Sequence, residues 1–139
     1  MPDREPDLLK EHMPGPRLAV AAEALFLANL MIAPGLAFLA LLALWLRHRH
    51  DAPLVVRNHL QQTVVASLYG GAMLVGVSAA IFFLGGFDDP WSWVLGVLYF
   101  VSFHATLIIF GVIGLNHAIL GRSWQYPFIG PELFEQDHE

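Results

Sequence analysis

The chain has 139 residues, of which 56% are hydrophobic and only 14% are charged, and its formal net charge is −5. Its mean hydropathy of +0.56 is too high for a soluble domain of this size. The acidic balance excludes nucleic acid as a partner, because no segment is basic enough to bind phosphate backbones. The absence of cysteine excludes disulfides, iron–sulfur clusters and thiolate metal sites.

Three long apolar runs follow a polar, proline-bearing N-terminal segment, residues 1–17, which we expect to be a soluble tail without a cleavable signal peptide. Each run is longer than the ~20 residues that a helix needs to cross the hydrocarbon core. We therefore predict an all-α integral membrane bundle of three transmembrane helices. The predicted spans are 18–46, 60–86 and 91–119, inside a domain of residues 18–121 that precedes a polar C-terminal tail, residues 122–139.

The first predicted span has Pro34-Gly35 near its middle. Proline removes a backbone donor from a helix, so we predict a single helix with a kink at this point. The alternative is a re-entrant hairpin, because each half is too short to cross the membrane alone. Glu23 and Asn29 are the only strongly polar residues of this run, and they are the candidates for lining a polar pathway.

The basic residues predict an orientation in the membrane. The loop 47–59 contains Arg47, Arg49 and Arg57, whereas the loop 85–91 contains no basic residue. The positive-inside rule then places the loop 47–59 and the C-terminus in the cytoplasm of a multi-pass protein of the bacterial inner membrane. The side of the N-terminal tail stays open, because that tail has basic residues of its own.

Histidines are the only residues that suggest a cofactor. His59, in the polar stretch RNHLQQ at residues 57–62, and His117, at the end of the third span, are expected at a similar depth. A b-type haem needs two axial histidines at matching depth, so this pair is the weak haem candidate. His104 lies near the middle of its span without an equal on another span. We expect no cofactor, no metal site and no catalytic residues, since no reactive side chains converge.

Small residues predict helix packing. Ala72, Gly76 and Ala80 recur at every fourth position of the second span, and Gly111 and Gly114 form a second small patch in the third. Such small-xxx-small ridges let another membrane helix approach closely. Three helices cannot cover all of this surface, so we expect self-association or a larger complex.

Two segments resemble a known family. PLVVRNHLQQTVVASLY at the second span and HAILGRSWQYPFIG after the third are similar, in order and spacing, to segments of the Tic-twenty-like superfamily. That superfamily includes the magnetosome membrane proteins MamF and MmsF. The matching residues are Val56, Arg57, His59 and Gln62 in the first segment, and Ala118, Gly121, Tyr126 and Pro127 in the second.

The resemblance implies a fold but no chemistry. Its plant branch is linked to protein import and its magnetosome branch to control of crystal size. We carry over neither role, because the loop 85–91 offers only Asp88 and Asp89 as acidic groups. The motif residues all fall at one membrane interface, where we expect the start of the second span to dock on the tail of the third. We predict a structural clasp of Arg57, His59, Gln62, Gly121, Tyr126 and Pro127.

These observations predict a non-enzymatic small membrane protein that acts by association, as an accessory or assembly subunit of a larger membrane complex. A membrane-bound oxidoreductase or hydrogenase is one host that fits. Its partners would be the lipid bilayer and other membrane subunits or further copies of itself. The alternatives are an oligomeric pore or transport component that uses Glu23 and Asn29, and a b-haem protein that uses His59 and His117.

Overall fold

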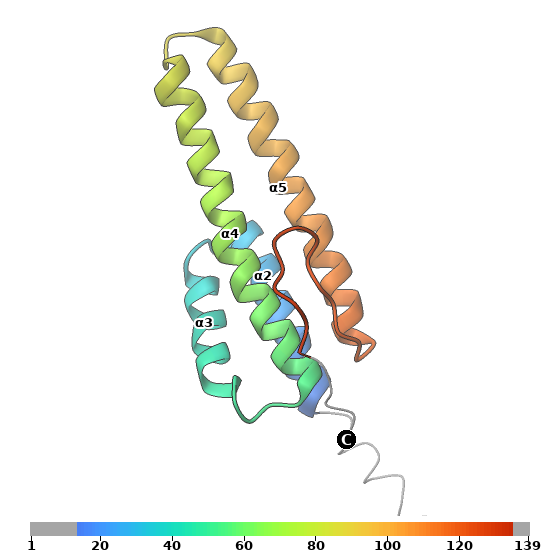
Figure 1. The fold of residues 1–139 in the computed structure, drawn as a ribbon. Helices are drawn as coiled ribbons and strands as arrows, with labels where there is room; N and C mark the ends of the chain where they lie inside the picture. Colours follow the sequence, from blue (N-terminus) through green and yellow to red (C-terminus); the bar gives the residue numbers. More distant parts are fainter. Residues whose placement is uncertain (1–13, 135–139) are drawn as a thin grey trace, which may run out of the picture.

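The computed structural model describes residues 14–134, and this part of the chain is helical without strands (Figure 1). Residues 1–13 of the predicted N-terminal tail and residues 135–139 of the predicted C-terminal tail lie outside the described residues. The helices, in chain order, are α2 (Pro14–Met31), α3 (Leu36–His48), α4 (Leu54–Gly85) and α5 (Pro90–Ile119).

The first predicted span is not one kinked helix, so that prediction is wrong. The run 18–46 forms two helices, and Figure 1 shows α3 returning beside α2 toward the end where α2 began. Leu18 and Trp45, at the outer ends of the two helices, pack on the same core cluster. The hairpin that the sequence offered as the alternative is the observed structure.

The reversal between α2 and α3 depends on Pro34, on Gly35 and on hydrogen bonds within the turn. Pro34 cannot continue the hydrogen bonds of α2, and Gly35 has a φ of 85°, in the left-handed region that favours glycine. The side-chain oxygen Oδ1 of Asn29 accepts a hydrogen bond of 2.8 Å from the backbone N–H of Gly35. The amides of Ile32 and Ala33 bond to the carbonyl of Ala28. The turn therefore satisfies the backbone donors of Ile32, Ala33 and Gly35, as an apolar setting favours.

Helices α4 and α5 form a long antiparallel pair. At 32 and 30 residues, they are the helices among residues 14–134 that are long and apolar enough to cross a membrane. The polar stretch 57–62 is already inside α4, which begins at Leu54 rather than at residue 60. Residues 14–134 thus contain two helices long and apolar enough to span a membrane where three were predicted, because the first run forms the shorter hairpin.

The turn between α4 and α5 explains why the two helices stay paired at that end. Gly86, with a φ of 90°, ends α4, and Asp89 caps α5 by accepting from the N–H of Trp91 at 3.4 Å. The indole N–H of Trp93 donates to the carbonyl of Phe87 at 2.8 Å. Farther down, the hydroxyl of Tyr99 donates to the carbonyl of Met73 on α4.

The core lies at the opposite end of the bundle. There α2, α3 and the C-terminal segment after α5 cover about half the length of α4 and α5, while the other half stands alone (Figure 1). We call residues 121–134 the C-terminal strap, because Figure 1 shows them running back across the helices. Two buried apolar clusters in this end consist of Ala19, Ala22, Phe26, Leu41, Val56, Leu60, Val64, Ala66, Ala118 and Tyr126.

We predict that the two ends of the α2–α3 hairpin are on the same side of the membrane. The chain has no cysteine, so single cysteines can be introduced cleanly at Arg17, His50 and Asp88, all of which are exposed. In sealed vesicles, a membrane-impermeant maleimide should label Arg17→Cys and His50→Cys from one side and Asp88→Cys from the other. Labelling of Arg17→Cys together with Asp88→Cys would instead require a single crossing helix over residues 18–46.

Candidate functional site

A buried carboxylate lies at the centre of the covered end. Glu23 on α2 has no solvent exposure, and its two oxygens have separate partners. Oε1 lies 2.6 Å from Nδ1 of His59 on α4, which is also fully buried. Oε2 accepts a 2.5 Å hydrogen bond from the hydroxyl of Tyr126 in the strap. Glu23 therefore connects three parts of the chain that are far apart in sequence.

The protons of this cluster follow from the partners. Nε2 of His59 lies 2.7 Å from the backbone carbonyl of Arg122, and a carbonyl oxygen can only accept, so Nε2 carries a hydrogen. One further proton lies between Nδ1 of His59 and Oε1 of Glu23. The pair is an ion pair when this proton is on the nitrogen and a neutral pair when it is on the oxygen. In both states every polar atom of the cluster is hydrogen bonded.

The hydroxyl of Tyr126 donates a hydrogen bond to Glu23 whether the Glu23–His59 pair is charged or neutral. Its burial and the neighbouring Glu23 carboxylate raise the pKa of the Tyr126 hydroxyl far above its usual range. The hydroxyl stays protonated and remains a donor to Glu23. The ring packs edge-to-face on Phe26 of α2, with 5.2 Å between centroids, and so also contributes apolar contact.

Two side-chain amides on α4 hold the backbone of the strap. Gln62 donates from Nε2 to the carbonyl of Pro131 at 2.5 Å, and its Oε1 accepts from the N–H of Tyr126 at 3.0 Å. One turn earlier, Asn58 accepts from the N–H of Phe134 at 2.8 Å and donates to the hydroxyl of Ser123 at 3.1 Å. Residues at i and i+4 share a helix face, which aims both amides at the strap.

Glycines permit the close approach of the surrounding chain. A Cβ at Gly114 on α5 would lie 2.6 Å from Oε2 of Glu23, and one at Gly111 would lie 2.6 Å from Leu27. A Cβ at Gly130 in the strap would overlap the side-chain oxygen of Gln62. The patch predicted at Gly111 and Gly114 thus faces α2 of the same chain.

The structure brings together part of the predicted clasp. His59, Gln62 and Tyr126 meet around Glu23 and the strap, as described above. Arg57 lies farther out, with its guanidinium 4.6 Å from the ring centroid of Phe134. Gly121, with a φ of 68°, ends α5, and Pro127 lies in the turn of the strap. That these residues act as a clasp stays a prediction.

The sequence reasoning missed two central residues. The sequence assigns Glu23 only to a polar pathway, and Asn58 is not among the residues of the predicted clasp. The available signal was the position of Glu23 as the only carboxylate within a long apolar run, since a buried charge needs a partner. Asn29, the other pathway candidate, bonds to the turn at Gly35.

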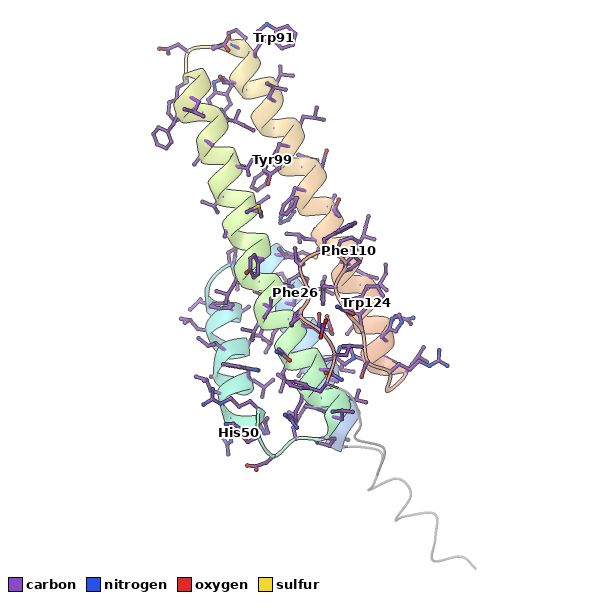
Figure 2. All side chains as sticks on the ribbon, viewed as in Figure 1. Phe26, His50, Trp91, Tyr99, Phe110 and Trp124 are labelled. Atoms are coloured by element: carbon purple, nitrogen blue, oxygen red, sulfur yellow. The ribbon has the colours of Figure 1, made fainter. Side chains whose placement is uncertain are left out.

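The histidines proposed for haem are engaged elsewhere. Both ring nitrogens of His59 are hydrogen bonded, so neither presents a lone pair to iron in this arrangement. Nδ1 of His117 bonds to the carbonyl of Ile113, and its ring lies 4.8 Å from that of Trp124, labelled in Figure 2. His104 stacks on Phe100 at 5.5 Å. Residues 14–134 contain no cluster of side chains suited to a metal ion.

We predict that Tyr126→Phe lowers the free energy of unfolding by about 1–3 kcal/mol, because Oε2 of Glu23 is then buried without its donor. Thermal unfolding in a mild detergent measures the change. The matched control is Tyr69→Phe, whose side chain is 59% exposed, and its effect should stay within about 0.5 kcal/mol. Equal stability of the two variants would show that the Tyr126 hydroxyl contributes nothing.

We also predict that Gly114→Ala destabilises the fold by about 1–3 kcal/mol, because the added methyl group meets the carboxylate of Glu23. Gly71→Ala is the control, since a Cβ at Gly71 meets nothing within 4 Å and alanine favours the helix. The comparison uses the same unfolding measurement. A stable Gly114→Ala protein would mean that α2 and α5 separate at little cost.

Comparison with known proteins identifies the family. The family model described as the magnetosome magnetite crystal formation protein family, MamF and MmsF, matches residues 17–133. The match includes Glu23, the polar start of α4 and nearly the whole strap. No curated protein and no solved structure was found to match the chain.

The resemblance to MamF and MmsF is confirmed, and the wider Tic-twenty-like grouping stays a prediction. The chain therefore belongs to the MamF and MmsF family of magnetosome membrane proteins.

Proposed function

We propose that the chain is a non-enzymatic membrane protein that acts by association, as an accessory or assembly subunit of a larger complex in the membrane. The observation that carries the proposal is an open small-residue ridge on α4. Ala72, Gly76 and Ala80 are exposed, and a Cβ at Gly76 would meet nothing within 4 Å. They lie on the half of α4 that the α2–α3 hairpin and the strap do not cover.

The two small-residue patches support different uses. Gly111 and Gly114 are in contact with α2, so the bundle itself uses them for close packing. The α4 ridge has the same chemistry and no partner among residues 14–134. Close contact between helices replaces the hydrophobic effect as the main attraction inside a bilayer, where lipid already surrounds apolar side chains. A second membrane helix is the partner that fits this ridge.

The family description concerns magnetite crystal formation. The two carboxylates in the turn between α4 and α5, Asp88 and Asp89, indicate how this chain would contribute. Asp89 is occupied in capping α5, with oxygens 3.4 Å from the N–H of Trp91 and 3.5 Å from the hydroxyl of Ser92. Asp88 is the other carboxylate of this turn. One free carboxylate is a poor template for an iron oxide surface, which favours a contribution through association with other membrane proteins.

The test replaces Gly76 and follows the complex. The full chain is purified from native membranes in a mild detergent, and co-purifying proteins and further copies are quantified by mass spectrometry. Gly76→Leu should reduce the association constant about tenfold, equivalent to about 1.4 kcal/mol, because the bulky side chain holds the partner helix away. The fold should be unaffected, since the position faces open space.

Gly71→Leu is the matched control. It makes the same substitution at another open position of α4, on a different face of the helix from Gly76. It should leave association unchanged. The proposal is wrong if the wild-type chain purifies as a monomer without partners, or if Gly71→Leu weakens association as much as Gly76→Leu.

A further inference from the structure

A small cavity opens where the end of α3, the start of α4 and the end of the strap meet. Its volume is about 190 Å³, several times the about 30 Å³ that one water molecule occupies in the liquid. It therefore has room for a group of several heavy atoms. Figure 2 labels His50, which follows α3. It lies at the end of the bundle opposite to the end that carries Trp91. The lining side chains are Trp45, Arg49, His50, Arg57, Gln61 and Phe134.

The wall of this cavity is cationic. The guanidinium carbon of Arg49 lies 5.2 Å from the centroid of Trp45, and that of Arg57 lies 4.6 Å from the centroid of Phe134. Stacking on an aromatic ring covers the face of a guanidinium group and leaves its in-plane N–H donors available. Neither arginine forms an ion pair with a carboxylate of residues 14–134.

Buried polar atoms in the same wall have no partner in the described chain. Nε of Arg57 and Oε1 of Gln61 are both shielded from solvent and make no hydrogen bond there. Buried polar groups are usually hydrogen bonded, so each such atom calls for a partner. The oxygen and nitrogen of a glutamine amide exchange places by rotation, and Gln61 then offers a donor beside that of Arg57.

The start of α4 adds to the positive potential. The helix begins after Pro53 without a side-chain cap, and its first turn contains no acidic residue. The N-terminus of a long helix favours a negative charge through its free N–H groups and its dipole. Asp51 is the carboxylate of the loop before α4, and it is exposed and does not line the cavity.

We propose that this cavity binds a phosphate-bearing anion, as presented by the headgroup of an anionic phospholipid. The cavity lies at the polar end of a membrane-spanning helix, next to a tryptophan of the kind that marks the headgroup region. Guanidinium groups suit phosphate because their N–H donors match its oxygens. The site is separate from the Gly76 ridge, so it goes beyond the proposed association and is tested independently of it.

The experiment measures binding to the full chain in a mild detergent by native mass spectrometry. Phosphatidylglycerol, phosphatidylcholine and inorganic phosphate are the probes, the last also as a competitor. Arg49→Gln should weaken binding of phosphatidylglycerol about tenfold, equivalent to about 1.4 kcal/mol. Arg49 is exposed, so the fold does not depend on it, and Arg57→Gln is the second variant. Arg47→Gln, an equal loss of charge two residues away and outside the cavity, should have less than about a twofold effect.

The outcomes separate the sources of the anion. Preference for phosphatidylglycerol over phosphatidylcholine, lost in Arg49→Gln and resistant to inorganic phosphate, supports a lipid headgroup. Competition by inorganic phosphate supports the same site with a soluble phosphate compound as its ligand. Equal binding of the two lipids, or equal weakening by Arg47→Gln, would overturn the proposal.

The acidic residues after Phe134 require one further control variant. Residues 135–139 lie outside the described residues and contain Glu135, Asp137 and Glu139. A variant with Glu135→Gln, Asp137→Asn and Glu139→Gln should bind the anionic lipid at least as well as the wild type. Binding that appears only in this variant would also overturn the proposal, because the chain's own carboxylates would then be the occupant.

Discussion

The covered end of the bundle depends on the burial of one carboxylate. Removing Glu23 from solvent is costly unless both of its oxygens are hydrogen bonded. His59 and Tyr126 are the hydrogen-bond partners of the two oxygens, and each comes from a different part of the chain. The carboxylate therefore forces α2, α4 and the strap into one arrangement.

The burial of Glu23 also restricts the residues around it. His59 must present a hydrogen on Nε2 to the carbonyl of Arg122, which ties the start of the strap to α4. Residue 114 is favoured as glycine, since a Cβ there would lie 2.6 Å from the carboxylate. The strap, once anchored at Tyr126, is held along its length by the amides of Asn58 and Gln62. The polar start of α4 is thus the surface on which the strap is bound.

The sequence predicted the long helices well because their signal is local. An uncharged run bounded by Gly86, Asp89 and Pro90 leaves little choice for α4 and α5. The α2–α3 hairpin was not predicted, because Pro34-Gly35 is compatible with both a kink and a reversal. The choice depends on contacts that no local pattern contains. Asn29 bonds to the turn, and Leu18 and Trp45 pack on the same core cluster.

Sequence patterns predicted only part of the candidate site. His59, Gln62 and Tyr126 lie in motifs that the resemblance marked, and their shared membrane level was inferred from the direction of the spans. Glu23 was assigned to a pathway because its partners lie 36 and 103 residues away in the chain. Sequence patterns identify an isolated carboxylate as important, but they do not say which distant donors reach it.

The uneven distribution of polar contacts has a physical reason in a membrane. Lipid surrounds apolar side chains as favourably as a protein core does, so apolar contact contributes little to specificity there. Hydrogen bonds and close backbone contacts remain, and the buried polar side chains, apart from Ser92, lie where the hairpin and strap meet α4 and α5. The other half of the α4–α5 pair has a capped turn, the Tyr99 bond to Met73 and an open ridge of small residues. One end is therefore specified by contacts within the chain, and the other end has a close-packing surface that is open among residues 14–134, where the proposed partner helix would bind.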